Sequence, residues 1–274
     1  MSRSISATGN RVARDADTQE DSLASQWSRL GAGLTVAAAP APVDIEQLIV
    51  ATLYEAPSDP RLFWVMVAWL SVHGVFVDRR QLVRRLDALA GASEIDSGAG
   101  LASAIGGAAF GIVAEWGGPT AKIASSIQQH CQPLQTTRAL FDRVAKSRVL
   151  SALARDESLP VFSRWGLWYH EVTDARDAIR SVAGMLASAP ELHIRSVLGT
   201  DLSSAIVARL SHARESIAEL VLSTGATRIA VNDAVTMLVA RGLVTKPRDG
   251  YRKPISLAPG LARWLLRAPS APRR

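Results

Sequence analysis

The chain has 274 residues, of which 48% are apolar and 20% charged, and its formal net charge is +6. This length suits two modules of ordinary size, and the composition is sufficient for a packed core. The single cysteine, Cys131, excludes an intramolecular disulfide framework and a zinc site of paired cysteines, so we expect a cytoplasmic location.

Residues 1–43 are polar at first and then rich in alanine and proline. This composition predicts a flexible N-terminal segment and linker, with room for a short helix in "DSLASQWSRL". The small residues of "LGAGLTVAAAPAP" are typical of a signal-peptide cleavage region, but they follow the acidic "DADTQEDS", which is the wrong order for a secretory signal. No apolar run of about 18 residues is apparent, so we expect no membrane association.

Residues 44–190 are predicted to form an α-helical domain. The apolar spacing of "VDIEQLIVATLYEA" predicts its first helix. A second helix has Asp59 as its N-cap, Pro60 in its first turn and Gly74 as its stop. A third helix begins after Asp78 and carries arginines on its polar side, which favours a solvated face and leaves a DNA-contacting face as the alternative.

The remainder of this domain is also predicted to be helical. "GASEIDSGAGLASAIGGAAFGIVAEWGG" lacks the glycine spacing of a phosphate-binding loop, so its small residues indicate a closely packed helix that ends by Gly117. "PTAKIASSIQQHCQP" and "LQTTRALFDRVAKSRVLSALAR" predict further helices, as do residues 173–187. The aromatic "LPVFSRWGLWYHEV" favours a core or interface cluster, with stacking on unpaired bases as the alternative.

Residues 191–274 are predicted to form a second domain, and the positive charge lies there. They hold thirteen Lys or Arg residues against six Asp or Glu residues, a net charge of +7, whereas residues 1–190 carry −1. Such asymmetry favours a polyanionic partner, and solubility or binding of an acidic protein are the alternatives. Helices are expected in "DLSSAIVARLSH" and "AELVLST", followed by a turn at Gly225 and a third helix over residues 227–241.

A basic β-hairpin is expected after the third helix. Residues 243–245 and 255–257 are short strand candidates on either side of "KPRDGYRKP", in which Asp249 and Gly250 favour a tight turn. Cationic side chains on such a hairpin are suited to holding phosphates while a neighbouring helix contacts base edges.

The pattern from "LSH" through "LVLSTGATRIAVNDAVTMLVARGLV" to "YRKPISL", residues 210–257, resembles the bacterial winged helix-turn-helix family of the MarR/ArsR-like type. The fold expected from it is mainly α, an N-terminal helical domain followed by a C-terminal winged helix-turn-helix with a small β-hairpin wing. By position, the resemblance implies base-facing roles for Thr227, Arg228, Asn232, Asp233 and Thr236, and phosphate or wing roles for Lys246, Arg248, Tyr251, Arg252 and Lys253. Two residues depart from a usual base-reading helix: Ile229 is bulky and apolar, and the Asp233 carboxylate repels phosphate although it can accept from a cytosine amino group.

No enzyme is expected. The five histidines are scattered, without the spacing of a metal site or of a metalloprotease. His130 and Cys131 are adjacent, so on a helix they point about 100° apart and do not form a nucleophile and base. We therefore expect no catalytic residues, no metal and no cofactor.

The sequence predicts a DNA-binding transcriptional regulator that binds double-stranded DNA through the helix over residues 227–241 and the basic wing. A homodimer is expected, because one such module covers only half of a two-fold site. An antitoxin-type repressor, in which residues 44–190 bind a protein partner, is one form of this hypothesis, and these residues can equally serve a ligand or a dimer contact. The alternative is a winged helix used for protein contact without a DNA target.

Overall fold

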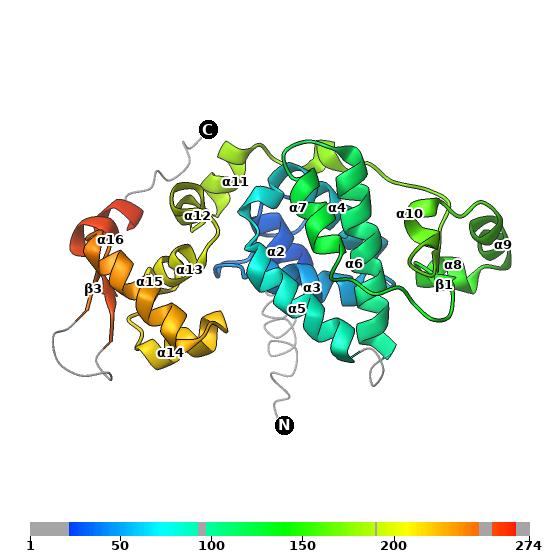
Figure 1. Cartoon of the computed structure of the whole chain (residues 1–274). Helices are drawn as coiled ribbons and strands as arrows, with labels where there is room; N and C mark the ends of the chain where they lie inside the picture. Colours follow the sequence, from blue (N-terminus) through cyan, green and yellow to red (C-terminus); the bar gives the residue numbers. More distant parts are fainter. Residues whose placement is uncertain (1–21, 93–96, 190, 247–253, 267–274) are drawn as a thin grey trace, which may run out of the picture. The chain divides into compact units, whose positions relative to one another are not determined.

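The computed structural model describes residues 22–92, 97–189, 191–246 and 254–266. The fold is mainly α, with a small antiparallel two-stranded sheet near the C-terminus (Figure 1). The chain divides into two compact units, here called unit 1 (Met1–Gly74 and Val83–Met185) and unit 2 (Val75–Leu82 and Leu186–Arg274). The sequence predicts a domain boundary at residue 190, and the division in the structure falls after Met185.

Unit 1 includes a segment that the sequence predicts to be linker. Helix α2 (Leu23–Arg29) begins at the N-cap Ser22, whose side chain accepts from the Ser25 N–H. Trp27 on this helix is fully buried, and its indole Nε1 donates to Thr52 Oγ1 at 2.9 Å. The helix expected in "DSLASQWSRL" is therefore confirmed, whereas the linker prediction is wrong for residues 22–43, because Trp27, Leu30, Ala32 and Ala39 are buried there.

Two predicted helices of unit 1 are confirmed, with the expected ends. Helix α3 (Ile45–Glu55) is capped by Asp44, and α4 (Pro60–His73) is capped by Asp59 and followed by Gly74. Residue Trp69 of α4 is fully buried, and its indole Nε1 donates to the Leu30 carbonyl at 2.9 Å. A short 3-10 turn, η1 (Gly74–Phe76), and helix α5 (Arg79–Ala92) follow.

The glycine- and alanine-rich stretch forms the long helix α6 (Ser97–Trp116), which ends before Gly117 as predicted. Its residues Gly98–Trp116 are long and apolar enough to cross a membrane, which the sequence prediction missed, and 78% of that window is buried inside the structure. Small residues permit this close packing: a Cβ on Gly107 would lie 2.4 Å from the indole ring of Trp165. Helix α7 (Ala121–Gln128) packs along α6, and Gln128 Nε2 donates to the Gly107 carbonyl at 2.9 Å.

The remaining elements of unit 1 are short. They are β1 (Arg138–Ala139), α8 (Asp142–Lys146), α9 (Arg148–Asp156), α10 (Pro160–Ser163), β2 (Leu167–Trp168), η2 (Arg176–Ala178) and α11 (Val182–Ser188). Strands β1 and β2 pair in parallel. Helices are confirmed in "LQTTRALFDRVAKSRVLSALAR" as α8 and α9, although its beginning forms β1. The helix predicted over residues 173–187 is confirmed only from Val182 onward, as α11, because backbone hydrogen bonds of Arg180 to Gly31 and of Ala178 to Gly33 join the preceding residues to the N-terminal segment.

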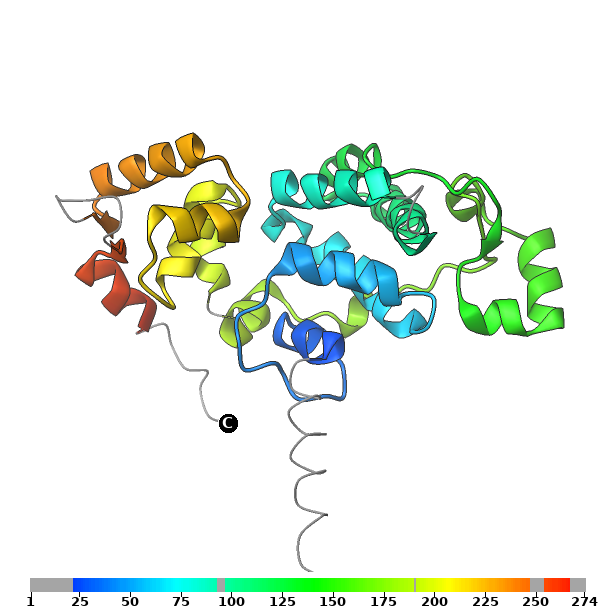
Figure 2. The same ribbon diagram turned by 90° about the horizontal axis from the view of Figure 1, so that it is seen from below.

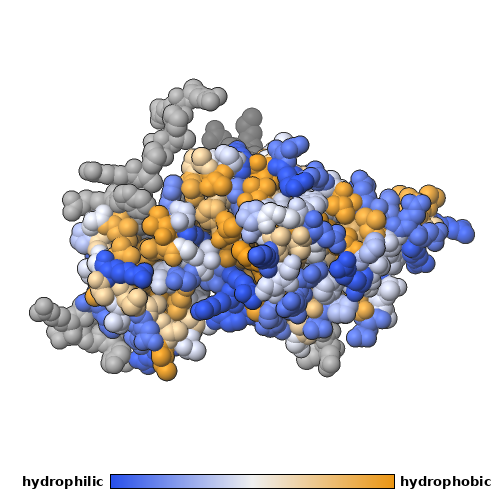
Figure 3. Space-filling view, turned by 45° about the horizontal axis from the view of Figure 1, so that its top comes forward, coloured by the Kyte–Doolittle hydropathy of each residue, from blue (hydrophilic) through white to orange (hydrophobic). Residues whose placement is uncertain are grey.

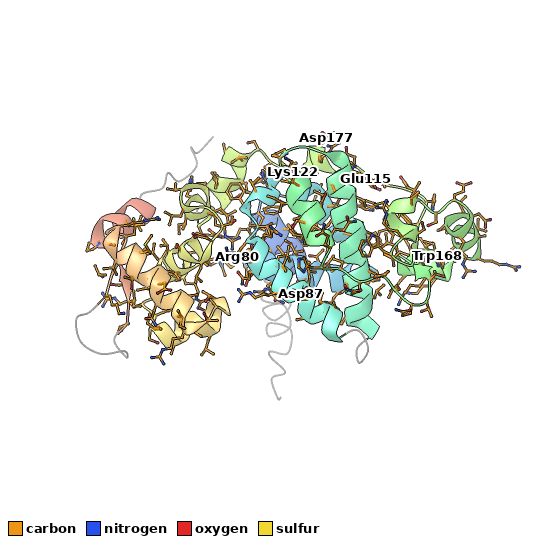
Figure 4. The ribbon with its side chains drawn as sticks, in the orientation of Figure 1. Arg80, Asp87, Glu115, Lys122, Trp168 and Asp177 are labelled. Atoms are coloured by element: carbon orange, nitrogen blue, oxygen red, sulfur yellow. The ribbon has the colours of Figure 1, made fainter. Side chains whose placement is uncertain are left out.

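The aromatic stretch of the sequence lies in the core of unit 1, as predicted. The ring of Tyr169 packs edge-on against Phe141 and Phe162, with centroids 4.8 and 5.7 Å away. The ring centroids of Tyr169 and of Trp64 on α4 are 6.3 Å apart. Trp168, labelled in Figure 4, is covered by the Arg155 guanidinium at 4.7 Å from its ring centroid.

Unit 2 is a smaller bundle with a terminal hairpin, seen from a second direction in Figure 2. Its elements are α12 (Leu192–Leu198), α13 (Leu202–Leu210), α14 (Ile217–Thr224), α15 (Arg228–Ala240), β3 (Val244–Thr245), β4 (Ser256–Leu257) and α16 (Pro259–Leu266). Its core is aliphatic, and Val231, Val235 and Leu238 of α15 are fully buried in it.

Candidate functional site

Helices α14 and α15 form a tight helical hairpin whose ends are fixed by local chemistry. A capping box begins α14: Ser216 Oγ accepts from the Glu219 N–H at 3.3 Å, and Glu219 accepts from the Ser216 N–H at 2.6 Å. These bonds hold the pKa of the Glu219 carboxyl below its usual value. Gly225 ends α14 with φ +62°, a left-handed conformation that glycine adopts without a Cβ penalty. Thr227, two residues after Gly225, is the N-cap of α15. The turn between the helices is therefore fixed by Gly225 at its start and by Thr227 at its end.

Short strands follow and precede the α14–α15 hairpin in the sequence and pair with one another. Strand β3 pairs with β4 in antiparallel register, Val244 opposite Leu257. Glu215 adds a single bridge on the other side of this pair, exchanging backbone hydrogen bonds with Ile255 at 2.8 and 3.2 Å. The β3–β4 pair confirms the strand positions predicted for residues 243–245 and 255–257.

One side of α15 is exposed along its whole length. Arg228, Ile229, Asp233, Thr236 and Met237 are all exposed, and Asn232 is half-buried beside them. Asn232 Nδ2 donates to the Arg228 carbonyl at 3.0 Å, and Thr236 Oγ1 donates to the Asn232 carbonyl at 2.8 Å. Their oxygen atoms, and the second N–H of the amide, keep hydrogen-bonding capacity for a partner. We call this surface the α15 face.

The structure brings together most of the residues that the sequence predicts to face bases. Arg228, Asn232, Asp233 and Thr236 lie on the α15 face. Thr227 serves as the N-cap, its Oγ1 accepting from the Ala230 N–H at 3.3 Å, so this hydroxyl already has a structural role. Lys246 is exposed directly after β3. The other predicted wing residues, Arg248, Tyr251, Arg252 and Lys253, lie outside the described residues.

The α15 face also carries apolar side chains that sequence reasoning did not assign to the site. Ile229 is 75% exposed and Met237 is 53% exposed. On the preceding helix, Leu222 is 84% exposed. The helical period could have identified Met237, because it follows Asp233 by four residues and so lies on the same side of α15.

Among the acidic side chains of unit 2, Glu215 is buried, whereas Glu219 and Asp233 are exposed. Glu215 is buried and pairs with Arg209, its Oε1 accepting from both Nη2 at 2.6 Å and Nε at 2.8 Å. Glu219 is used in the capping box of α14. Asp233 is thus the carboxylate that the described part of unit 2 presents on the α15 face.

His130, next to Cys131 in the sequence, contacts an acidic side chain of unit 1. The His130 Nδ1 atom lies 2.9 Å from Oδ1 of Asp87 on α5, and Asp87 is labelled in Figure 4. Burial, reinforced by the Asp87 charge, raises the pKa of the Cys131 thiol to about 12, so the thiol is protonated at neutral pH and is a poor nucleophile. Among the described residues, no group of three or more His, Cys, Asp or Glu side chains is placed to hold a metal ion.

Comparison of the chain with protein-family models, curated proteins and solved structures finds no match. Its function is therefore inferred from the residues and geometry described above.

Proposed function

We propose that this protein is a DNA-binding transcriptional regulator whose C-terminal domain is a winged helix-turn-helix. The observation that carries the proposal is the order of elements in unit 2: helix α13, the Glu215 bridge, the α14–α15 hairpin, and the β3–β4 pair. In a winged helix this order places the last helix of the hairpin in the major groove, and the loop between the two strands against the phosphate backbone. The long exposed side of α15 suits the role of the helix that enters the major groove.

Charge supports the same proposal. Residues 191–274 carry a net charge of +7, and five of their cations are Arg241, Lys246, Arg248, Arg252 and Lys253, in or beside the segment that joins β3 to β4. Phosphate contacts supply affinity that is independent of base sequence, whereas groups on the α15 face supply base discrimination. Asn232 is suited to adenine and Asp233 to the amino group of cytosine.

The proposed regulator acts in the cytoplasm as a homodimer on a two-fold DNA site, since one module of this size contacts one half-site. Residues 44–190 then provide a dimer contact, a ligand site or a surface for a protein partner. An antitoxin-type repressor, which neutralises such a partner, is one version of this proposal.

Fluorescence anisotropy of the full-length chain with duplex DNA across a salt series tests the proposal. We expect binding that weakens steeply as salt rises, and a slope that falls by about two units in Arg248→Ala/Arg252→Ala. Lys146→Ala/Arg148→Ala is the matched control, because it removes two exposed cations from unit 1 and is expected to keep the slope. Absence of binding at about 50 mM salt would contradict the proposal.

A second candidate is a winged helix that contacts protein and not DNA. The exposed apolar side chains Leu222, Ile229 and Met237 favour it, because apolar groups gathered on one helical hairpin are typical of protein interfaces. Salt-insensitive DNA binding, or none, together with loss of a captured partner in Leu222→Asp, would support this candidate over the first.

A further inference from the structure

We infer that Ile229 and Met237 are specificity residues that recognise thymine methyl groups in the DNA target; this inference rests on the proposed function. Both side chains lie on the α15 face, where the resemblance assigns roles only to polar neighbours. Ile229 stands in the first turn of α15, the part of a recognition helix that contacts base edges most directly.

The exposure of these two side chains leaves them available to a partner surface that covers apolar groups. Ile229 is 75% exposed and Met237 53%, whereas the intervening Val231 and Val235 are fully buried in the core of unit 2. Neither exposed side chain therefore contributes substantially to the stability of the core. Figure 3 shows that apolar residues are also exposed elsewhere on the molecule, so exposure alone does not identify the partner.

Charge complementarity identifies duplex DNA as that partner. Arg228 precedes Ile229 and is exposed, Lys246 is exposed after β3, and residues 191–274 carry a net charge of +7. Within the major groove the base edges offer one apolar group, the C5-methyl of thymine. An isoleucine and a methionine on a helix in that groove are therefore matched to thymine, as Asn232 beside them is matched to adenine.

The spacing along the helix predicts the pattern of the target. Ile229 and Met237 are eight residues apart, which corresponds to about 12 Å along an α-helix. Because base pairs rise by about 3.4 Å and a helix in the major groove lies oblique to the DNA axis, this distance spans at most roughly three to four base-pair steps. We expect two thymines within that separation in each half-site, with the contact of Ile229 the stronger because of its greater exposure and its place in the first turn.

Replacement of single thymines by deoxyuridine in a selected duplex tests the inference, because deoxyuridine lacks only the methyl group. The full-length chain is first used to select duplexes from a random pool, and affinity is then measured by anisotropy. We expect deoxyuridine at the position contacted by Ile229 to weaken binding about fourfold, the effect of one buried methyl group. In Ile229→Ala the thymine and deoxyuridine duplexes are expected to bind equally, while the salt slope stays unchanged.

Val149→Ala is the matched control, since Val149 on α9 of unit 1 is 77% exposed and is expected to leave the thymine preference intact. Salt-dependent binding with no effect of deoxyuridine at any position would overturn the thymine inference and leave the proposed function standing. Full discrimination against deoxyuridine by Ile229→Ala would likewise overturn the role of Ile229 in recognising thymine. Failure to bind any duplex would overturn both proposals.

Discussion

The two units of the chain use their large side chains differently. In unit 1, Trp27 and Trp69 are fully buried, and both indole N–H groups donate to partners at 2.9 Å. In unit 2 the described core is aliphatic, and four large apolar side chains of the α14–α15 hairpin, Leu222, Ile229, Met237 and Val239, are exposed. The core of unit 1 therefore includes large aromatic side chains with hydrogen-bonded indoles, whereas the described core of unit 2 is aliphatic, and large apolar side chains are exposed in both units.

Trp27→Ala should have the largest effect on stability, because it removes a fully buried indole and leaves Thr52 without that donor. We expect unit 1 to lose about 4 kcal/mol of unfolding free energy, measured by chemical denaturation. Val149→Ala, at an exposed site in the same unit, should change it by less than about 0.5 kcal/mol. An equally small effect of Trp27→Ala would mean that residues 22–43 do not belong to the core of unit 1.

Substitutions at the neighbouring positions Met237 and Leu238 distinguish the exposed side of α15 from its buried side. Leu238 is fully buried, so Leu238→Ala should destabilise unit 2 by about 3 kcal/mol. Met237 is 53% exposed, so Met237→Ala should leave stability within about 0.5 kcal/mol of the parent. Circular dichroism during denaturation measures both, and similar losses for the two variants would place Met237 in the core and remove it from the α15 face.

The smallest expected effect is a dependence of unit 1 on pH through His73. Burial lowers the pKa of His73, and its hydrogen bond with the Arg180 carbonyl at 2.8 Å opposes this only in part. As pH falls below about 6.5, the unfolded chain therefore takes up this proton before the folded chain does, and stability declines. In His73→Gln that part of the decline should disappear from denaturation curves measured between about pH 7.5 and pH 5.5, about one unit either side of the ordinary pKa of 6.5. A parent chain whose stability is constant over this range would contradict the assignment.

Features set by neighbours in the sequence could be predicted. Asp59 and Pro60 begin α4, and Gly117, Gly225 and Gly242 adopt the positive φ values expected where helices end. Each depends on one residue and its immediate chain neighbours, so a single sequence contains the necessary information.

Features set by distant contacts could not be predicted. Trp27 is buried against α3, and its contact with Thr52 joins residues 25 positions apart. The expected helix over residues 173–187 is broken because Arg180 N–H donates to the Gly31 carbonyl. In the candidate site, residue type and position indicated Arg228, Asn232 and the apolar Ile229, whereas the exposure of Met237 became evident only from the packing of α15 against its core.

Hydroxyl-radical footprinting of the full-length chain with and without saturating duplex DNA tests most directly whether the α15 face binds DNA. Met237 is 53% exposed, whereas Met66 and Met185 are fully buried and serve as internal controls in the same sample. We predict that DNA strongly reduces oxidation of Met237, as measured by mass spectrometry, and leaves the two controls unchanged. Oxidation of Met237 that stays the same while DNA is bound would contradict the central claim.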